Sequence, residues 1–212
     1  MSETKQRTIV KKVENAVLFS DGTLRIDNVR FSHPHIGTPY EGKNDKGVMT
    51  KRYGVVVILP KTTHVAAKDL VVERINELLK ENKLSKIGAD RKFIRNGDDA
   101  AKDEYEGTWT VSAGETKVPD ARDKDKTKLT PEQADEKFYG GMYGNVLIRP
   151  WFQMPGEYGT RVNAGLVAVQ YVREGEPFGS GRITAKDVDD SFDDVDGDES
   201  FSGSSSDDND GL

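Results

Sequence analysis

The acidic composition of the last 26 residues limits which part of the chain can form a folded core. Residues 187–212 contain eleven acidic residues and no Lys or Arg, and their few apolar side chains are isolated. Such a segment cannot offset its conformational entropy by burying apolar surface, so we expect a disordered acidic tail at residues 183–212. The whole chain has 37 acidic and 31 basic residues, which leaves the body before residue 187 with a net charge of +5. A basic body joined to an acidic tail is typical of nucleic-acid-binding and interaction proteins.

The composition narrows the class of protein further. The chain has no cysteine, which excludes disulfide bonds, a thiol nucleophile and zinc sites built on cysteine. It has no apolar run of about eighteen residues and no apolar segment near its N-terminus, so we expect no membrane span and no signal peptide. These features indicate a cytoplasmic protein. The length suits one domain at residues 15–182, preceded by a basic mobile arm at residues 1–14.

Hydrophobic patterns predict most of the body to be β-structure. Five strands are expected, at residues 24–31, 51–59, 107–112, 142–152 and 161–172. The second is apolar on both faces and should be central in a sheet. The Pro- and Gly-rich residues 32–47 are predicted to be a loop, and the highly charged residues 113–129 a mobile loop.

Two helices are predicted between the strands. The first spans residues 63–82, with Thr62 or Thr63 as N-cap and an apolar stripe at Val71, Val72, Ile75, Leu78 and Leu79. The second begins at Thr130, where Pro131 and Gln133 complete the pattern of a capping box. The order of elements predicts a mainly β fold with inserted helices. We expect an OB-fold-like five-stranded antiparallel barrel, an architecture that binds oligonucleotides.

No motif points to catalysis, a metal or a cofactor. The glycines match neither a phosphate-binding loop nor a dinucleotide fingerprint. His33 and His35 lack an evident third ligand, so a loop histidine, with or without a base stacked on it, is the better interpretation. The acids of the tail do not have the spacing of an EF-hand. The acids of the body lie mostly in predicted loops, so we expect no enzyme, no metal site and no cofactor.

Aromatic residues next to cations are the most informative pattern. Binding of single-stranded nucleic acid needs aromatic faces for the bases and Lys or Arg for the phosphates. Any one aromatic residue in a strand is about equally expected to lie in the hydrophobic core and to face a ligand. Tyr40, Tyr53 and Trp151 are expected on the surface, because a polar residue adjoins each. The stacking candidates are Phe31, Tyr40, Tyr53, Trp109, Tyr143, Trp151 and Tyr158. The phosphate candidates are Arg30, Lys43, Lys51, Arg52, Arg149 and Arg161.

Several short motifs in a fixed order resemble a tailed-bacteriophage family of single-stranded DNA-binding proteins. The motifs lie at residues 29–36, 53–61, 105–107, 139–143, 163–170 and 173–179, so the resemblance covers about residues 25–182. It implies an OB-fold core without enzymatic activity that binds single-stranded DNA. Replication proteins of similar plan end in an acidic tail with a terminal apolar or aromatic residue that recruits partners. This chain ends in Leu212, which leaves the partner of the tail open.

The function expected from these observations is sequence-independent binding of single-stranded DNA during phage replication and recombination, in the host cytoplasm. The tail would compete with DNA for the basic body and recruit replication proteins, and its removal would permit weak duplex binding. The tail residues assigned to this role are Asp187, Asp189, Asp190, Asp193, Asp194, Asp207, Asp208, Asp210 and Leu212. A monomer or weak homodimer is expected. The alternative is an acidic-tailed structural or interaction protein, such as a virion component or chaperone, without a DNA ligand.

Overall fold

The computed structural model describes residues 7–43, 47–154 and 159–179 together with Ser191. The chain divides into two compact units, Met1–Ser180 and Gly181–Leu212. All the described residues except Ser191 belong to the first unit. The acidic residues and Leu212 that we assigned to the tail lie outside the described residues, as do Tyr158 and the first six residues of the predicted arm at residues 1–14.

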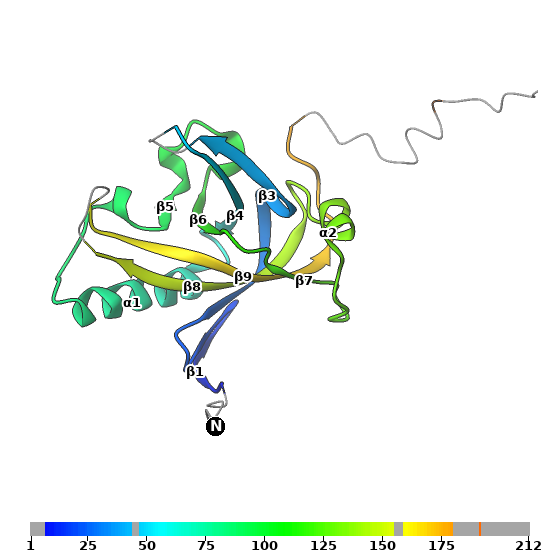
Figure 1. Cartoon of the computed structure of the whole chain (residues 1–212). Helices are drawn as coiled ribbons and strands as arrows, with labels where there is room; N and C mark the ends of the chain where they lie inside the picture. The colour runs from blue at the N-terminus through cyan, green and yellow to red at the C-terminus, as the bar shows by residue number, and fades with distance from the viewer. Residues whose placement is uncertain (1–6, 44–46, 155–158, 180–190, 192–212) are drawn as a thin grey trace, which may run out of the picture. The chain divides into compact units, whose positions relative to one another are not determined.

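A nine-stranded sheet forms most of the first unit (Figure 1). Its main path runs β5-β6-β4-β3-β8-β9-β7, and the β1–β2 hairpin joins it through β3. Every pairing is antiparallel except that of β7 with β9. The strands are β1 (Ile9–Val13), β2 (Ala16–Phe19), β3 (Leu24–Lys43), β4 (Met49–Pro60), β5 (Ile94–Asn96), β6 (Thr108–Glu115), β7 (Asp120–Arg122), β8 (Tyr143–Gln153) and β9 (Arg161–Arg173).

Five long strands follow the plan of an OB-fold. Strands β3, β4 and β6 form a meander, and β8 pairs with the other edge of β3 and continues into β9. β6 and β9 then approach each other, and Lys92 forms an isolated parallel bridge to Val162 at this junction. The predicted mainly β fold with inserted helices is therefore confirmed, with four shorter strands added to the expected five.

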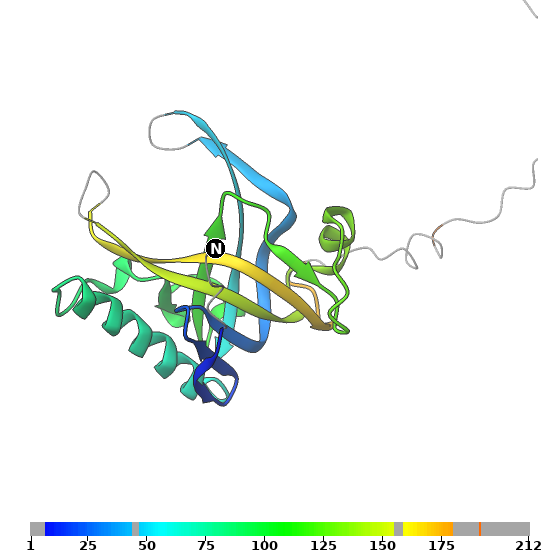
Figure 2. The same cartoon turned by 60° about the horizontal axis from the view of Figure 1, so that its bottom comes forward.

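Helix α1 (Val65–Glu81) covers one side of the sheet beside the β1–β2 hairpin (Figure 2). The predicted helix at residues 63–82 is confirmed, and its buried face includes Leu70, Val71, Ile75, Leu78 and Leu79. The predicted threonine N-cap is wrong, because His64 occupies the cap position without a capping hydrogen bond. His64 is buried, and its Nε2 lies 3.1 Å from the carbonyl oxygen of Asp27.

Helix α2 (Pro131–Lys137) begins with the predicted capping box. The Thr130 hydroxyl accepts from the Gln133 amide, and the Gln133 side chain accepts from the Thr130 amide. The Asp135 carboxylate then accepts three hydrogen bonds, from the amides of Gly37 and Thr38 and from the Thr38 hydroxyl. These bonds hold α2 against β3. Three short 3₁₀-helices, η1 (Ala89–Arg91), η2 (Gly97–Asp99) and η3 (Asp103–Tyr105), lie between α1 and β6.

Three segments differ from the sequence prediction. The predicted loop at residues 32–47 is mostly strand, because β3 continues to Lys43 and pairs with β4. Its prolines and glycines are accommodated by irregular pairing, and His33 adopts a φ of 48° at one such break. The predicted mobile loop at residues 113–129 contains the end of β6 and the whole of β7. Residues 9–13 of the predicted mobile arm form β1.

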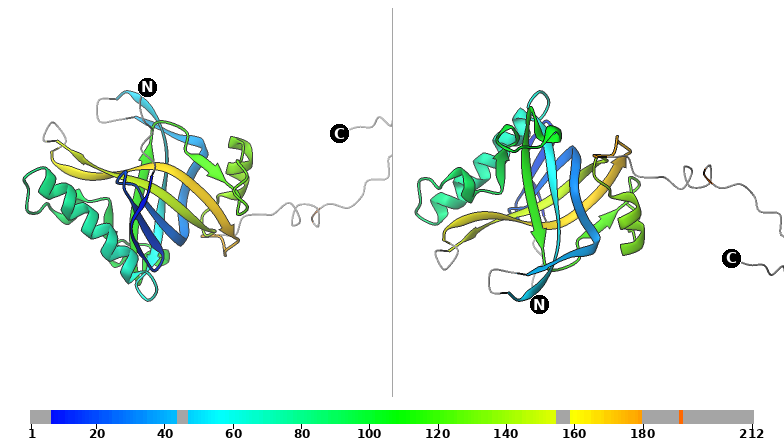
Figure 3. Two further views of the ribbon diagram at one scale, coloured as in Figure 1. Left: turned by 90° about the horizontal axis from the view of Figure 1, so that it is seen from below. Right: turned by 90° about the horizontal axis from the view of Figure 1, so that it is seen from above.

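The core lies inside the barrel and beneath α1. On β8, Val146, Ile148 and Pro150 are buried, whereas Arg149 and Trp151 are exposed. This alternation is the ordinary period of a strand with one face on the core. The ends of the β3–β4 and β8–β9 hairpins extend beyond the rest of the barrel (Figure 3). Their outward faces are therefore available to a ligand.

Candidate nucleic-acid interface

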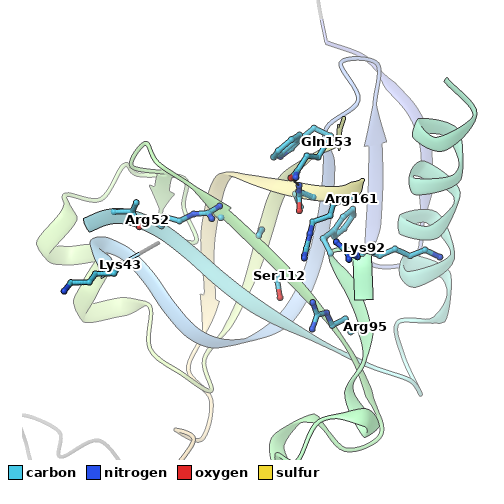
Figure 4. Close-up of a pocket in the computed structure, with 15 residues that line it drawn as sticks. Lys43, Arg52, Lys92, Arg95, Ser112, Gln153 and Arg161 are labelled. Atoms are coloured by element: carbon cyan, nitrogen blue, oxygen red, sulfur yellow. Dashed lines mark hydrogen bonds between the residues drawn. The ribbon is translucent and has the colours of Figure 1, made fainter. Parts of the chain in front are cut away.

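A groove of about 750 Å³ lies on the outside of the barrel, and six cationic side chains line it. Lys43 and Arg52 lie on one side, from the β3–β4 hairpin, and Gln153 and Arg161 lie on the other, from the β8–β9 hairpin (Figure 4). Ser112 of β6 lies between them, and Arg95 of β5 lies on the side of Arg161. We call this feature the basic groove; its cations are Lys43, Arg52, Arg91, Lys92, Arg95 and Arg161.

Among the described residues that line the basic groove there is no Asp or Glu. Asp90 lies next to it and forms an ion pair with Arg91 at 3.1 Å, while its backbone carbonyl accepts from Arg95 at 3.4 Å. Several positive charges along one concave surface create a positive potential that attracts a polyanion. The electrostatics therefore suit a chain of phosphates.

Strand alternation decides which cation of β4 enters the basic groove. Arg52 points into it, whereas the neighbouring Lys51 points to the other face and pairs with Glu41. The hydrogen bond and charge of Glu41 raise the pKa of Lys51. Gly114 of β6 pairs with Gly54 of β4. A Cβ atom at Gly114 would lie 3.7 Å from the Arg52 guanidinium. Arg52 therefore lies over β6 at this position.

The opposite wall combines an aromatic ring with fixed amides. Trp151 is 44% exposed and lines the basic groove. Asn163 lies opposite Trp151 in the β8–β9 pairing, and its side chain donates to Gln153 at 2.9 Å. Gln153 in turn donates to the carbonyl oxygen of Gly159 at 3.3 Å. This wall therefore presents one exposed aromatic ring held beside ordered polar groups.

The structure brings together four of the residues predicted from the sequence. Lys43, Arg52, Trp151 and Arg161 all line the basic groove. Arg149 lies on the same face of β8 as Trp151, two residues away and outside the lining. Tyr40 is 60% exposed on β3, paired with Arg52 across the strands, so it lies near the groove without lining it.

Two of the predicted residues have structural roles instead. Phe31 has no exposed surface and packs on Phe138 with ring centres 5.7 Å apart, so the prediction that it stacks on a base is wrong. Arg30 donates to the carbonyl oxygens of Gly141 at 3.0 Å and Glu176 at 2.6 Å. Its guanidinium is therefore committed to holding the chain after β9, and the prediction of a phosphate contact is withdrawn.

The other predicted aromatics lie away from the basic groove. The Arg173 guanidinium covers the Tyr143 ring at 3.3 Å from its centre, so that face cannot receive a base. Trp109 packs against the core, with the Lys68 ammonium 5.1 Å from its ring. Tyr53 is half-buried on β4 and pairs with Glu115.

Sequence reasoning missed a segment that supplies three of the six cations of the basic groove. Arg91, Lys92 and Arg95 lie around η1 and β5, between α1 and β6. A signal was present, because residues 91–95 read Arg-Lys-Phe-Ile-Arg, the same pairing of cations with an aromatic that identified Arg52 and Trp151. Because β5 has only three residues, the segment shows no strand pattern of its own.

The chemistry of a metal centre is not evident in the described residues. Within residues 7–43, 47–154 and 159–179, no three His, Asp or Glu side chains are arranged to hold a metal ion. His33 lies instead beside Ser32, with 2.7 Å between its Nδ1 and the Ser32 hydroxyl. No helix in the same part of the chain is long and apolar enough to span a bilayer.

Comparison with known proteins gives consistent matches. A family model described as the single-stranded DNA-binding protein of Enterobacter phage Enc34 matches residues 23–201. The structure of the bacteriophage Enc34 single-stranded DNA-binding protein in complex with single-stranded DNA is 36% identical, covering 82% of this chain and 99% of that one with a TM-score of 0.75. A C-terminal truncation of that protein is 38% identical, covering 84% and 100% with a TM-score of 0.74. A putative protein p50 of Acyrthosiphon pisum secondary endosymbiont phage 1 is 25% identical over 177 residues, 79% of this chain and 92% of the relative.

Proposed function

The chain belongs to the phage family of single-stranded DNA-binding proteins represented by that of Enterobacter phage Enc34, and from this premise we propose that it holds the DNA strand in the basic groove. The observation that carries the proposal is the gathering of six cations and an exposed tryptophan in one groove, with no acidic residue among the described residues that line it. Family membership also argues against the alternative of an acidic-tailed structural protein without a DNA ligand.

In the proposed mode of binding, phosphates lie along the cations and a base stacks on Trp151. Arg52 and Arg161, from opposite walls, contact phosphates on the two sides of the strand. Stacking uses the face that all bases share, and cations read no sequence, so binding is largely independent of sequence. The protein keeps the strand unpaired and protected in phage replication and recombination in the host cytoplasm, and performs no chemistry on it.

We expect the affinity to fall steeply with salt. Each neutralised phosphate releases counterions, with a slope of roughly −0.7 per contact on a plot of log affinity against log salt. If all six cations of the basic groove contact phosphates, the slope is about −4. Fluorescence titration of a labelled dT oligomer between about 50 and 200 mM NaCl measures it. An affinity that does not change with salt would contradict binding through the groove.

We propose that the acidic tail restrains DNA binding and recruits replication proteins. The proposal is supported by its eleven acidic residues, joined covalently to a body of net charge +5. A chain ended at Lys186 is expected to bind single-stranded DNA several-fold more tightly and to gain weak binding to a duplex, because a tethered competitor has been removed. A gel shift with matched single- and double-stranded oligomers measures both effects. Unchanged or weaker binding by the truncated chain would argue against this role.

A further inference from the structure

A second hollow, of about 420 Å³, lies on the outward face of β8 and β9 next to β7. Its floor is apolar and includes Leu147 and Ala168, which face each other in the β8–β9 pairing. Its rim carries three cations, Arg25 of β3, Arg122 of β7 and Lys126. We call this feature the β8–β9 hollow. None of the described residues predicted from the sequence to bind DNA lines it.

The β8–β9 hollow and the basic groove share one face of one strand. Side chains alternate along β8, so Leu147, Arg149 and Trp151 point the same way, while Ile148 and Pro150 between them are buried. Trp151 lines the basic groove and Leu147 the β8–β9 hollow. The two residues are four positions apart, roughly 13 Å along a strand. Arg149 is exposed midway between them.

The neighbouring strand does not offer an equally open route. On β9, Gly165 lies between Asn163 of the basic groove and Ala168 of the β8–β9 hollow. A side chain at Gly165 would begin 3.2 Å from the Glu115 carboxylate of β6. A negative group therefore lies over β9 at this point. A strand of phosphates that connects the two concavities is thus expected to follow β8 over Arg149.

The rim retains positive charge after its internal ion pairs are counted. Arg25 pairs with Asp27 at 2.7 Å and Arg122 with Asp120 at 2.5 Å. Lys126 is exposed and lies in the turn after β7. Arg149, between the hollow and the groove, adds a further exposed cation, whose charge is partly balanced by the Asp21 carboxylate. An apolar floor beside cations has the two parts that a nucleotide requires, a surface for the base and a partner for the phosphate.

We propose that the β8–β9 hollow is a second contact site for the same DNA strand, which leaves the basic groove past Trp151, crosses Arg149 and places a base on Leu147 and Ala168. The inference rests on the proposed function and adds to it a length-dependent site. Oligomers that fill only the basic groove do not reach the hollow, whereas longer ones do. Continuity along β8 and the charge of the rim favour DNA over an acidic peptide as the occupant.

The test compares Lys126→Glu and Leu147→Glu in the full chain against a series of dT oligomers from about 4 to 20 nucleotides, a range that spans known OB-fold site sizes. Lys80→Glu, at an exposed position of α1, is the matched control for Lys126→Glu, because it makes the same charge change. Leu147→Glu adds only one negative charge, so a loss greater than that of Lys80→Glu cannot come from general charge. For the shortest oligomers that bind, we expect both rim and floor variants to match the control. For the longest, we expect each to bind at least fivefold more weakly than the control, as loss of one apolar contact with a base or of one phosphate contact predicts.

Three outcomes would overturn the proposal. One is that the variants equal the Lys80→Glu control at every length. Another is an equal extra loss at every length. The third is tighter binding at every length, the result expected if the hollow holds an acidic segment that competes with DNA. Lys126→Glu alone decides the matter if Leu147→Glu does not fold. Failure of the unaltered protein to bind even short oligomers would count against the proposed function instead.

Discussion

Replacing Arg52 and Arg161 together by alanine will weaken the binding of a dT oligomer about 100-fold at moderate salt. The two side chains lie on opposite walls of the basic groove. A hydrogen bond to a charged group is worth about 1.5 kcal/mol or more, so two lost contacts remove about 3 kcal/mol. A difference of 1.4 kcal/mol is a factor of ten in affinity. Fluorescence anisotropy with a labelled oligomer measures the change.

The adjacent residue supplies the control for this double variant. Lys51 carries the same charge one position earlier in β4, but it points to the other face and pairs with Glu41. We expect Lys51→Ala to change the affinity less than about twofold, because a solvent-exposed ion pair contributes little. Equal losses in Lys51→Ala and in Arg52→Ala would mean that general charge, rather than the basic groove, attracts the DNA.

Replacing Trp151 by alanine will weaken binding about tenfold and leave the salt slope unchanged. Stacking of one base on an aromatic ring contributes roughly 1–3 kcal/mol and releases no counterion. Loss of a phosphate contact would instead reduce the slope. A salt titration of Trp151→Ala beside the unaltered protein therefore separates stacking from charge. Trp151→Phe is expected to retain most of the affinity, since phenylalanine keeps a ring.

Tryptophan fluorescence provides an independent measurement of the same contact. The chain has two tryptophans, Trp151 in the basic groove and Trp109 packed against the core. We expect DNA to quench the fluorescence of Trp109→Phe, in which Trp151 remains, and to leave that of Trp151→Phe nearly constant. Quenching of Trp151→Phe and not of Trp109→Phe would place the strand elsewhere on the protein.

The long strands could be predicted from the sequence because the hydrophobic pattern of each lies within its own residues. The expected strands at residues 142–152 and 161–172 correspond to β8 and β9 almost residue for residue. The second half of β3 could not be predicted in this way, since its proline and glycine residues are typical of loops. Its conformation depends on distant partners, among them Asp135 of α2, which binds the amides of Gly37 and Thr38.

The candidate site was predictable only where a residue's face could be inferred. Arg30 and Phe31 are candidates because a cation stands beside an aromatic, yet neighbours in a strand point to opposite faces. Phe31 is in the core, and Arg30 binds backbone carbonyl oxygens. Arg52 and Trp151 lie on outward faces and line the basic groove. The sequence pattern alone does not separate these two cases, since register and barrel closure decide them.

The gathering of six cations in one groove also affects the fold itself. Like charges held close together repel, so the unbound body is less stable than one with a neutral groove would be. Phosphates remove that repulsion, and a ligand that binds only the folded chain adds stability of its own. Copies on DNA should therefore outlast free copies when host proteases act on transiently unfolded chains. Surplus protein would be the first to be degraded, so the amount of exposed single strand would set how much of it persists.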